Sequence, residues 1–203
     1  MNTTLLKEYT TEASDGYMGA IKTTGSKSRV YLRDAELTKQ IRQALQQVLA
    51  LELSKSDVRA RKHSYSMGRS IYITLRLDKD KYAVTREEYK AHVVDKVRRG
   101  KYNWIVGGDG REIFHRDYWD MTEEEKRKAE EATAERRAGW DYDAGDNEIN
   151  QYHIDDSDIL NDAGKEIARA ANQVIKAFNY DDSNSMVDYF DTNFYYTLKV
   201  EWK

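Results

Sequence analysis

The sequence contains no cysteine, so disulfide bonds, thiolate metal ligands and a cysteine nucleophile are all excluded. It also contains no proline, and its turns must therefore come from glycine, asparagine, aspartate and serine. No run of about 18 apolar residues is present, and the first residues lack the basic and apolar regions of a secretory signal. These absences predict a cytoplasmic protein that does not enter a membrane.

Charge is unevenly spread along the 203 residues, although the net charge is only -3. Residues 141–203 carry an excess of acidic side chains, whereas residues 1–140 carry an excess of basic ones. Such a division offers an anionic and a cationic surface, and each can steer a partner of opposite sign. The alternative is that the two surfaces neutralise each other.

Periodicity predicts a helix and then a hairpin in the first part of the chain. A stripe of apolar residues indicates a helix after Asp34, which is placed as its N-cap. Residues 58–63 and 70–77 alternate like two strands, and the SYSMG segment between them is typical of a hairpin loop. Residues 16–21 and 28–32 are weaker extended candidates, joined by a TTGSKS turn.

The rest of the chain predicts further helices, a hairpin and a closing strand. Residues 85–99 indicate a helix that ends at Gly100, followed by a hairpin around GGDG. Residues 122–138 form a highly charged helical pattern without an apolar stripe, which favours a solvated or partner-bound helix. A helix is expected around 155–178, and residues 194–202 alternate as a strand. The buried face of that helix is expected at Ala163, Ile167, Ala171, Val174 and Phe178.

These elements predict a single α+β domain over residues 1–203. We expect a mostly antiparallel sheet packed by two main helices. Residues 100–150 are expected to be a charged helical insertion in that domain.

Two segments carry the pattern of a known family. They are SYSMGRSIYI in the first hairpin and FNYDDSNSMVDYFDTNFY near the end of the chain. Over residues 36–77 and 163–202 the chain resembles the large polyvalent protein associated domains of phages and plasmids. The matching residues of the second segment are Asn179, Tyr180, Asp181, Ser183, Asp188, Tyr189, Phe190 and Asn193.

The resemblance implies a biological setting, in phages and plasmids, more than a specific chemical activity. Members occur within large phage and plasmid polyproteins, some of them thought to accompany injected DNA, and the family has no established catalytic activity or cofactor. The chain departs from the family after residue 77, where LDKDKYAV replaces a Trp-Thr-Asp-Gly-Pro-like turn. Functional specificity is therefore expected in the insertion.

No catalytic constellation emerges from the sequence. The four histidines lack the three- or four-residue spacing that places two imidazoles on one helix face for zinc. The HRD segment at 115–117 lacks the other kinase motifs, and TTGSKS lacks the spacing of a phosphate-binding loop. We therefore expect no enzyme, no metal and no cofactor.

An acidic stretch supplies the first candidate surface. Mixed with tyrosines, its carboxylates can imitate a phosphate array and occupy the basic cleft of a nucleic-acid enzyme. The alternatives are a solvated loop, a site for a hard cation, or dipole-favoured acids at the start of the next helix. The candidates are Asp141, Asp143, Asp146, Glu148, Asp155, Asp156 and Asp158.

A basic hairpin supplies the second candidate surface. Basic side chains interleaved with aromatic ones suit a nucleic-acid backbone and stacked bases, whereas the alternative is a solvated strand face. The candidates are Arg59, Arg61, Lys62, Tyr65 and Arg69.

Two functions remain in view. The leading hypothesis is a phage or plasmid counter-defence protein of the anti-CRISPR or anti-restriction type, acting in the host cytoplasm. It would bind and inhibit a host effector, such as a CRISPR nuclease complex or a restriction enzyme, by stoichiometric binding. The alternative is an accessory module that protects mobile-element DNA by binding nucleic acid through Arg61, Lys62 and Arg69.

Overall fold

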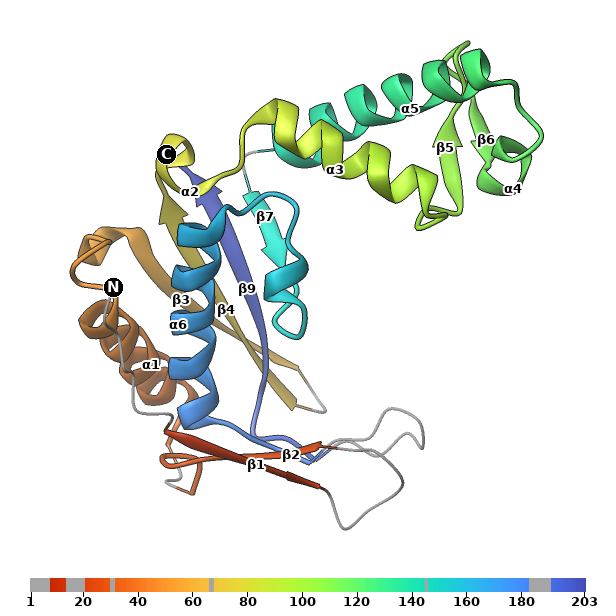
Figure 1. Cartoon of the computed structure of the whole chain (residues 1–203). Helices are drawn as coiled ribbons and strands as arrows, with labels where there is room; N and C mark the ends of the chain where they lie inside the picture. Colours follow the sequence, from red (N-terminus) through yellow and green to blue (C-terminus); the bar gives the residue numbers. More distant parts are fainter. Residues whose placement is uncertain (1–7, 14–20, 30–31, 66–67, 145, 183–190) are drawn as a thin grey trace.

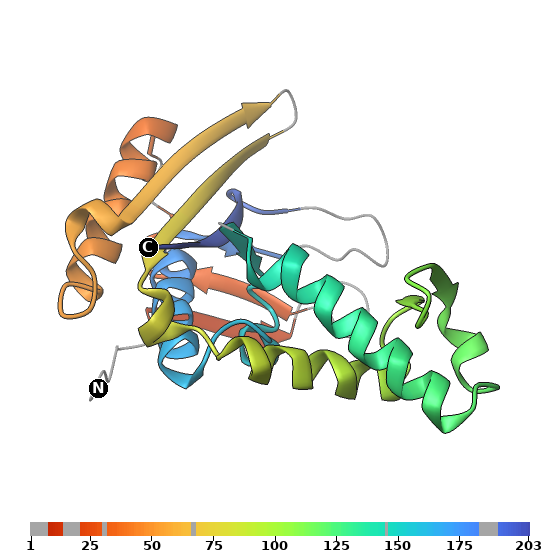
Figure 2. The ribbon, with the colours of Figure 1, turned by 90° about the horizontal axis from the view of Figure 1, so that it is seen from above.

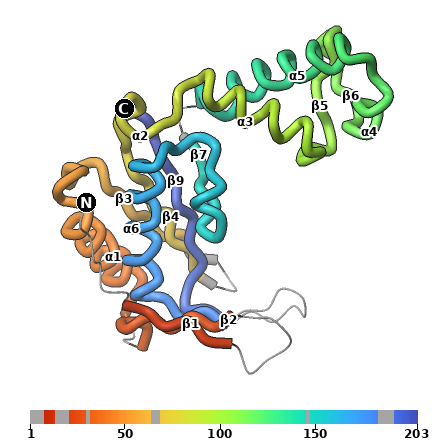
Figure 3. The backbone as a smooth tube through the Cα atoms, in the orientation of Figure 1, coloured from red at the N-terminus to blue at the C-terminus, as the bar shows by residue number. Residues whose placement is uncertain are grey.

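The chain folds into a body and a long arm (Figure 1). The computed structural model describes residues 8–13, 21–29, 32–65, 68–144, 146–182 and 191–203. The arm comprises residues 86–142 and projects from one end of the body (Figure 3). The predicted α+β class with mostly antiparallel pairing is confirmed.

The body is built on a four-stranded sheet. In spatial order its strands are β3 (Val58–Tyr65), β4 (Gly68–Leu77), β9 (Tyr195–Trp202) and β7 (Asp146–Ile149). The predicted hairpin of β3 and β4 is confirmed, and both strands continue farther into the SYSMG segment than expected. β9 pairs in parallel with β4 and antiparallel with β7, so the last strand of the chain lies inside the sheet.

Two helices, α1 (Asp34–Val48) and α6 (Asp162–Phe178), pack over one face of this sheet. Alternation along β4 places its apolar residues on that buried face. They are Ile71, Ile73, Leu75 and Leu77. The opposite face carries Tyr72, which is 40% exposed. The sheet therefore has one buried face and one open face, as the alternation predicts.

A second, three-stranded antiparallel sheet lies across the end of α6 (Figure 1). Its strands are β1 (Tyr9–Ala13), β2 (Ile21–Gly25) and β8 (Tyr180–Asp181). The expected TTGSKS turn is wrong for Thr23–Gly25, because β2 pairs with both β1 and β8. Of the weaker extended candidate at 16–21, residues 16–20 lie outside the described residues. Of the candidate at 28–32, residues 30–31 lie outside them, and Ser28 lies in a turn.

The arm is a pair of packed helices with a small hairpin at its far end (Figure 1). Its elements are α3 (Arg86–Arg98), β5 (Trp104–Val106), β6 (Glu112–Phe114), α4 (His115–Tyr118), α5 (Glu123–Arg137) and a π-helical turn, η2 (Ala138–Tyr142). The expected helix, its end at Gly100 and the hairpin around GGDG are confirmed. Gly100 has a φ of 67°, which favours glycine. The arm overlaps the expected insertion and begins earlier, at α3.

Helix α5 packs along one side inside the arm, so the expectation of a solvated helix is wrong for that side, and binding of a partner to α5 stays a prediction. Its buried residues are Ala129, Glu130, Thr133 and Ala134. They face α3 and β5, and the Val106 N–H donates a hydrogen bond to Thr133 Oγ1 at 2.8 Å. The short alanine and threonine side chains among them let the elements approach closely without forming the wide apolar stripe that marks most buried helices.

The two main helices begin at other residues than expected. Asp34 is the first residue of α1 and not its N-cap, because the extended Arg33 precedes the helix and makes no side-chain cap. α6 begins at Asp162, and Asn161 caps it by accepting a backbone hydrogen bond at 2.9 Å. The carboxylates of residues 155–158 therefore do not cap α6.

The buried face of α6 matches expectation except at its first position. Ala163 is exposed, and the neighbouring Gly164 is buried instead. Gly164 faces the carbonyl group of Tyr82, which belongs to the short helix α2 (Lys79–Tyr82). Two further short turns, η1 (Lys55–Asp57) and η3 (Ile154–Asp156), complete the connections.

Candidate functional site

The candidate carboxylates gather where the arm meets the body, and most of them have a basic partner. Four ion pairs join Asp141 to Arg137, Asp143 to Arg86, Asp155 to Arg169 and Asp158 to Lys96. Asp156 lies 3.2 Å from His153 Nδ1. Glu148 faces Lys199 across β7 and β9, and Asp146 is described only as backbone of β7. This pairing favours the alternative in which opposite charges compensate each other within the molecule.

Contacts at the base of the arm join its two helices and connect it to the body. Arg86 of α3 binds Glu135 of α5 at 2.6 Å and Asp143, directly after the arm, at 3.3 Å. The Tyr142 hydroxyl donates to the Val84 carbonyl oxygen at 2.8 Å, and burial raises the pKa of Tyr142. Lys79 donates to the Tyr142 carbonyl oxygen at 3.0 Å. The candidate Asp143 therefore contacts the base of the arm through Arg86.

A shallow hollow at the junction is lined by several carboxylates. Trp140, Asp141, Glu148, Asp156 and Asp158 are among its lining residues. Within the described ranges, no group of three or more histidine, aspartate or glutamate side chains is arranged to hold a metal ion. Because acidic groups without convergent geometry make poor cation sites, the cation alternative has no geometric support here.

The candidate basic residues do not form one surface. Arg59 and Arg61 lie on the open face of the sheet, where Arg59 contacts Glu201 at 3.4 Å. Lys62 alternates to the other side and lies 4.0 Å from Asp34. Arg69 also contacts Asp34, so Lys62 and Arg69 lie together at that carboxylate, whereas Arg61 lies on the other face of the sheet and does not join them.

Arg69 has a structural contact set. Its guanidinium binds Asp34 at 3.0 Å and donates to the carbonyl oxygens of Asn193 at 2.8 Å and Leu32 at 3.3 Å. These bonds join β4, α1 and the start of β9. Tyr65 is the remaining candidate. It lies at the end of β3, where the structure describes its backbone.

The described residues of the family segment join α6 to the two sheets. Asn179 is buried, donates to the Phe194 carbonyl oxygen at 3.2 Å and accepts from the Phe194 N–H at 3.3 Å. Asn193 donates to the Ser28 carbonyl oxygen at 2.9 Å, and its own N–H donates to the Tyr180 carbonyl oxygen. Asp181 lies in β8. These positions hold the fold together, while Ser183, Asp188, Tyr189 and Phe190 lie outside the described residues.

An exposed aromatic cluster lies at the far end of the arm, and the sequence patterns did not identify it. We call Trp104, Phe114, Arg116 and Trp119 the aromatic tip. Trp104, Phe114 and Trp119 are 47%, 43% and 57% exposed. The rings of Trp104 and Phe114 stack with centroids 3.7 Å apart, and the Arg116 guanidinium lies 4.9 Å from the Phe114 centroid. The dense aromatic composition of residues 102–119 was the only available signal.

The aromatic tip rests on a buried polar support. Glu130 accepts two hydrogen bonds from Arg98, at 2.9 and 2.8 Å, and one from the Tyr118 hydroxyl at 2.6 Å. Tyr118 and the buried His115 both contact the Trp119 ring, with centroids 5.3 and 5.5 Å away. Glu130 thus ties α5 to α3 and α4 directly beneath the tip.

Acid is expected to loosen the arm. The hydrogen bonds from Arg98 hold the pKa of Glu130 below its ordinary value of 4.5, although burial opposes this. A carboxyl group with a lowered folded-state pKa stabilises the fold above its unfolded pKa, and this contribution is lost as pH falls through the folded pKa. Tryptophan fluorescence should therefore report loosening of the arm below about pH 4.5, since Trp104, Trp119 and Trp140 belong to the arm.

The matched variants are Glu130→Gln and Glu131→Gln. Glu130→Gln should lower the free energy of unfolding at pH 7 by about 1–3 kcal/mol and weaken its dependence on acid pH. Glu131 is an exposed neighbour that contacts Arg127, so its substitution should change stability by at most about 0.5 kcal/mol. An unchanged acid profile in Glu130→Gln would show that other groups control the transition.

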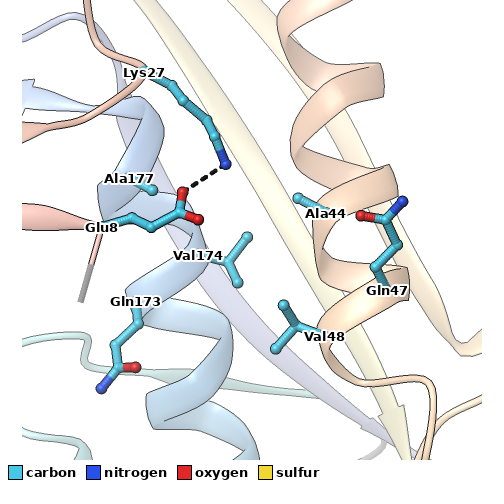
Figure 4. A pocket seen from close by; sticks show the side chains of 8 residues that line it. All are labelled: Glu8, Lys27, Ala44, Gln47, Val48, Gln173, Val174 and Ala177. Carbon is cyan, nitrogen blue, oxygen red and sulfur yellow. Dashed lines mark ion pairs between the residues drawn. The ribbon is translucent and has the colours of Figure 1, made fainter. Parts of the chain in front are cut away.

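A small groove between α1 and α6 lies elsewhere on the body (Figure 4). Ala44, Val48, Val174 and Ala177 contribute its apolar wall, and an ion pair of Glu8 with Lys27 at 2.6 Å crosses one end. The remaining lining residues are glutamines, Gln47 and Gln173. The groove therefore provides a packing surface between helices. Its lining residues supply no nucleophile and no acid–base pair positioned for catalysis.

None of the helices in the described parts of the chain combines the length and apolar character that a membrane crossing requires.

No protein-family model, curated protein or solved structure matches the chain. The resemblance over residues 36–77 and 163–202 therefore stays a prediction.

Proposed function

We propose that the chain is a non-catalytic binding protein that docks onto a partner protein through the aromatic tip. The observation that carries this proposal is the exposure of three large aromatic side chains at the end of a braced arm. Tryptophan and arginine are enriched among the residues that dominate protein interfaces, and each large aromatic ring can bury 150–250 Å². A site of this composition suits a partner surface with an apolar pocket.

Preorganisation strengthens this interpretation. Trp104 stacks on Phe114, and Trp119 packs edge-on against His115 and Tyr118. Because these contacts already restrict the rings, less side-chain entropy is lost when a partner covers them. The tip can therefore supply binding energy without a large rearrangement of the arm.

The family resemblance supports a mobile-element setting for this binding. The partner we propose is a host effector that handles nucleic acid, such as a CRISPR nuclease complex or a restriction enzyme in the host cytoplasm. Inhibition would be stoichiometric, with the arm occupying or covering a functional surface of the effector. In this proposal the acidic candidates contribute mainly by holding the arm in position, rather than by imitating phosphates.

The test is a tip variant, Trp104→Ala with Trp119→Ala, compared with Trp140→Ala. Trp140 is 60% exposed at the other end of α5, so it is a control for loss of an exposed tryptophan. The full chain is added to purified CRISPR and restriction effectors, and both retention and target-DNA cleavage are measured. Loss of two hot-spot residues should weaken binding about 100-fold or more, whereas Trp140→Ala should leave it within about threefold.

A charge-reversal variant distinguishes this proposal from acidic mimicry. Asp155→Lys with Asp156→Lys reverses two highly exposed candidate carboxylates, which are 74% and 79% exposed. Inhibition that survives this reversal and disappears in the tip variant supports docking by the aromatic tip. Inhibition that survives in the tip variant and disappears on charge reversal overturns it in favour of the acidic surface.

A further inference from the structure

We propose that the open face of the four-stranded sheet is a binding site for single-stranded nucleic acid. This site lies on the body and does not depend on the aromatic tip. Figure 2 shows the arm leaving the body on the side away from β3 and α1. The two surfaces can therefore be tested separately.

Sheet register places aromatic and basic side chains together on this face. Arg61 on β3 lies directly opposite Tyr72 on β4, and His63 lies opposite Ser70. Ser70 in turn lies opposite Tyr195 on β9. Because directly opposed residues share a face, these side chains form one continuous patch across three strands.

The two tyrosines provide the stacking surface. Tyr72 is 40% exposed and Tyr195 is 41% exposed. They are diagonal neighbours on adjacent strands, which places their backbone positions about 8 Å apart from strand spacing and rise. His63 packs edge-on against Tyr72, with centroids 6.2 Å apart and ring planes at 82°, and this contact restrains the Tyr72 ring. Aromatic rings held in this way on an open sheet suit successive unpaired bases.

Charge on the face is complementary to phosphate. Arg61 is exposed and has no ion pair among the described residues. Arg59 and Arg76 share the Glu201 carboxylate at 3.4 and 3.6 Å, so among the described side chains two cations contact one anion there. Lys199 lies on the same face, opposite Thr74 of β4 and Glu148 of β7, so Glu148 balances its charge and the excess rests on the arginines of β3 and β4. Phosphates passing along β3 and β4 would therefore meet an excess of positive charge beside the tyrosines.

This arrangement favours a single strand over a duplex. Bases inside a duplex already stack on one another and cannot offer their faces to tyrosine rings. A purely electrostatic site would attract both forms, whereas a site that adds stacking gains only from unpaired bases. Preference for single strands is thus the property that distinguishes this site from a general basic surface.

The experiment measures fluorescence anisotropy of a labelled single strand of about 20 thymidines with the full chain. Arg61→Glu is compared with Lys62→Glu, which makes the same charge change one residue away on the opposite side of β3. We expect Arg61→Glu and Tyr72→Ala each to weaken binding about tenfold, while Tyr72→Phe and Lys62→Glu stay within about threefold. Raising salt from 50 to 200 mM should weaken binding at least tenfold if several phosphates are contacted.

Several results would overturn the proposal. They are no binding at 50 mM salt, equal affinity for a duplex of the same length, and equal losses in Arg61→Glu and Lys62→Glu. Tyr72→Phe covers the case in which Tyr72→Ala fails to fold, because loss of affinity in a folded Tyr72→Phe variant contradicts stacking. The tip variant Trp104→Ala with Trp119→Ala should bind the strand normally, so failure of this site and failure of protein docking are distinguishable.

Discussion

Replacing Gly164 by alanine is expected to lower the free energy of unfolding by about 2–3 kcal/mol. A glycine-to-alanine change inside a helix ordinarily stabilises it by about 1 kcal/mol. Here a Cβ atom would lie 2.4 Å from the Tyr82 carbonyl oxygen and 3.1 Å from a methyl group of Leu160. The Tyr82 carbonyl cannot withdraw easily, because it accepts a hydrogen bond from the Asn161 N–H at 3.1 Å. Overpacking should therefore outweigh helix propensity.

Urea denaturation at pH 7 gives the measurement, and Gly139→Ala is the matched control. Gly139 lies in the π-helical turn η2 and has no heavy atom within 4 Å of an added Cβ. Its substitution should be neutral or slightly stabilising, because only propensity and unfolded-state entropy change. A Gly164→Ala variant as stable as the unchanged chain would mean that α2 and α6 can separate at little energetic cost.

Replacing Asn179 by leucine is expected to lower the free energy of unfolding by about 3 kcal/mol. The Asn179 amide satisfies both the N–H and the carbonyl oxygen of the buried Phe194. Leucine has a similar volume but can neither donate nor accept, so the buried Phe194 N–H would lose this acceptor, while the Phe194 carbonyl oxygen would keep the Thr192 hydroxyl at 3.1 Å. The junction between α6 and β9 should therefore weaken before the rest of the sheet.

The control for this variant is Gln173→Leu on the same helix. Gln173 is partly exposed and has no side-chain hydrogen bond among the described residues, so loss of its amide should change stability by at most about 0.5 kcal/mol. Hydrogen exchange of the β9 amides supplements urea denaturation and shows where the loss occurs. Equal stability of the two variants would refute the structural role that we assign to Asn179.

Local patterns of the sequence were sufficient for most elements of the fold. Alternation placed Ile71 and Ile73 on the buried face and Tyr72 on the open face, because a half-buried strand leaves that period of two in its sequence. The parallel pairing of β4 with β9 left no such trace, since it joins segments far apart in the chain. The strand at Thr23–Gly25 was missed because its residues are typical of a turn, and one of its two partners, β8, lies far along the chain.

The candidate site was less accessible to sequence reasoning. The acidic stretch was evident as composition, but the partners of Asp143 and Asp158 are Arg86 and Lys96, which lie far away in the sequence on α3. Charge compensation therefore depends on tertiary structure. Exposure of Trp104 was equally hidden, because large aromatic residues occur both in cores and at binding surfaces. Only the fold reveals which of these two settings applies.

A small change of angle at the base of the arm produces a larger displacement at its far end. α5 has 15 residues and is therefore about 22 Å long at 1.5 Å per residue. A tilt of about 10° at the junction would displace the far end of α5 by about 4 Å. At this junction the arm residue Tyr142 is hydrogen-bonded to Lys79 and Val84 of the body. Substitutions at the base of the arm can therefore misalign the aromatic tip with a partner while every residue of the tip stays unchanged.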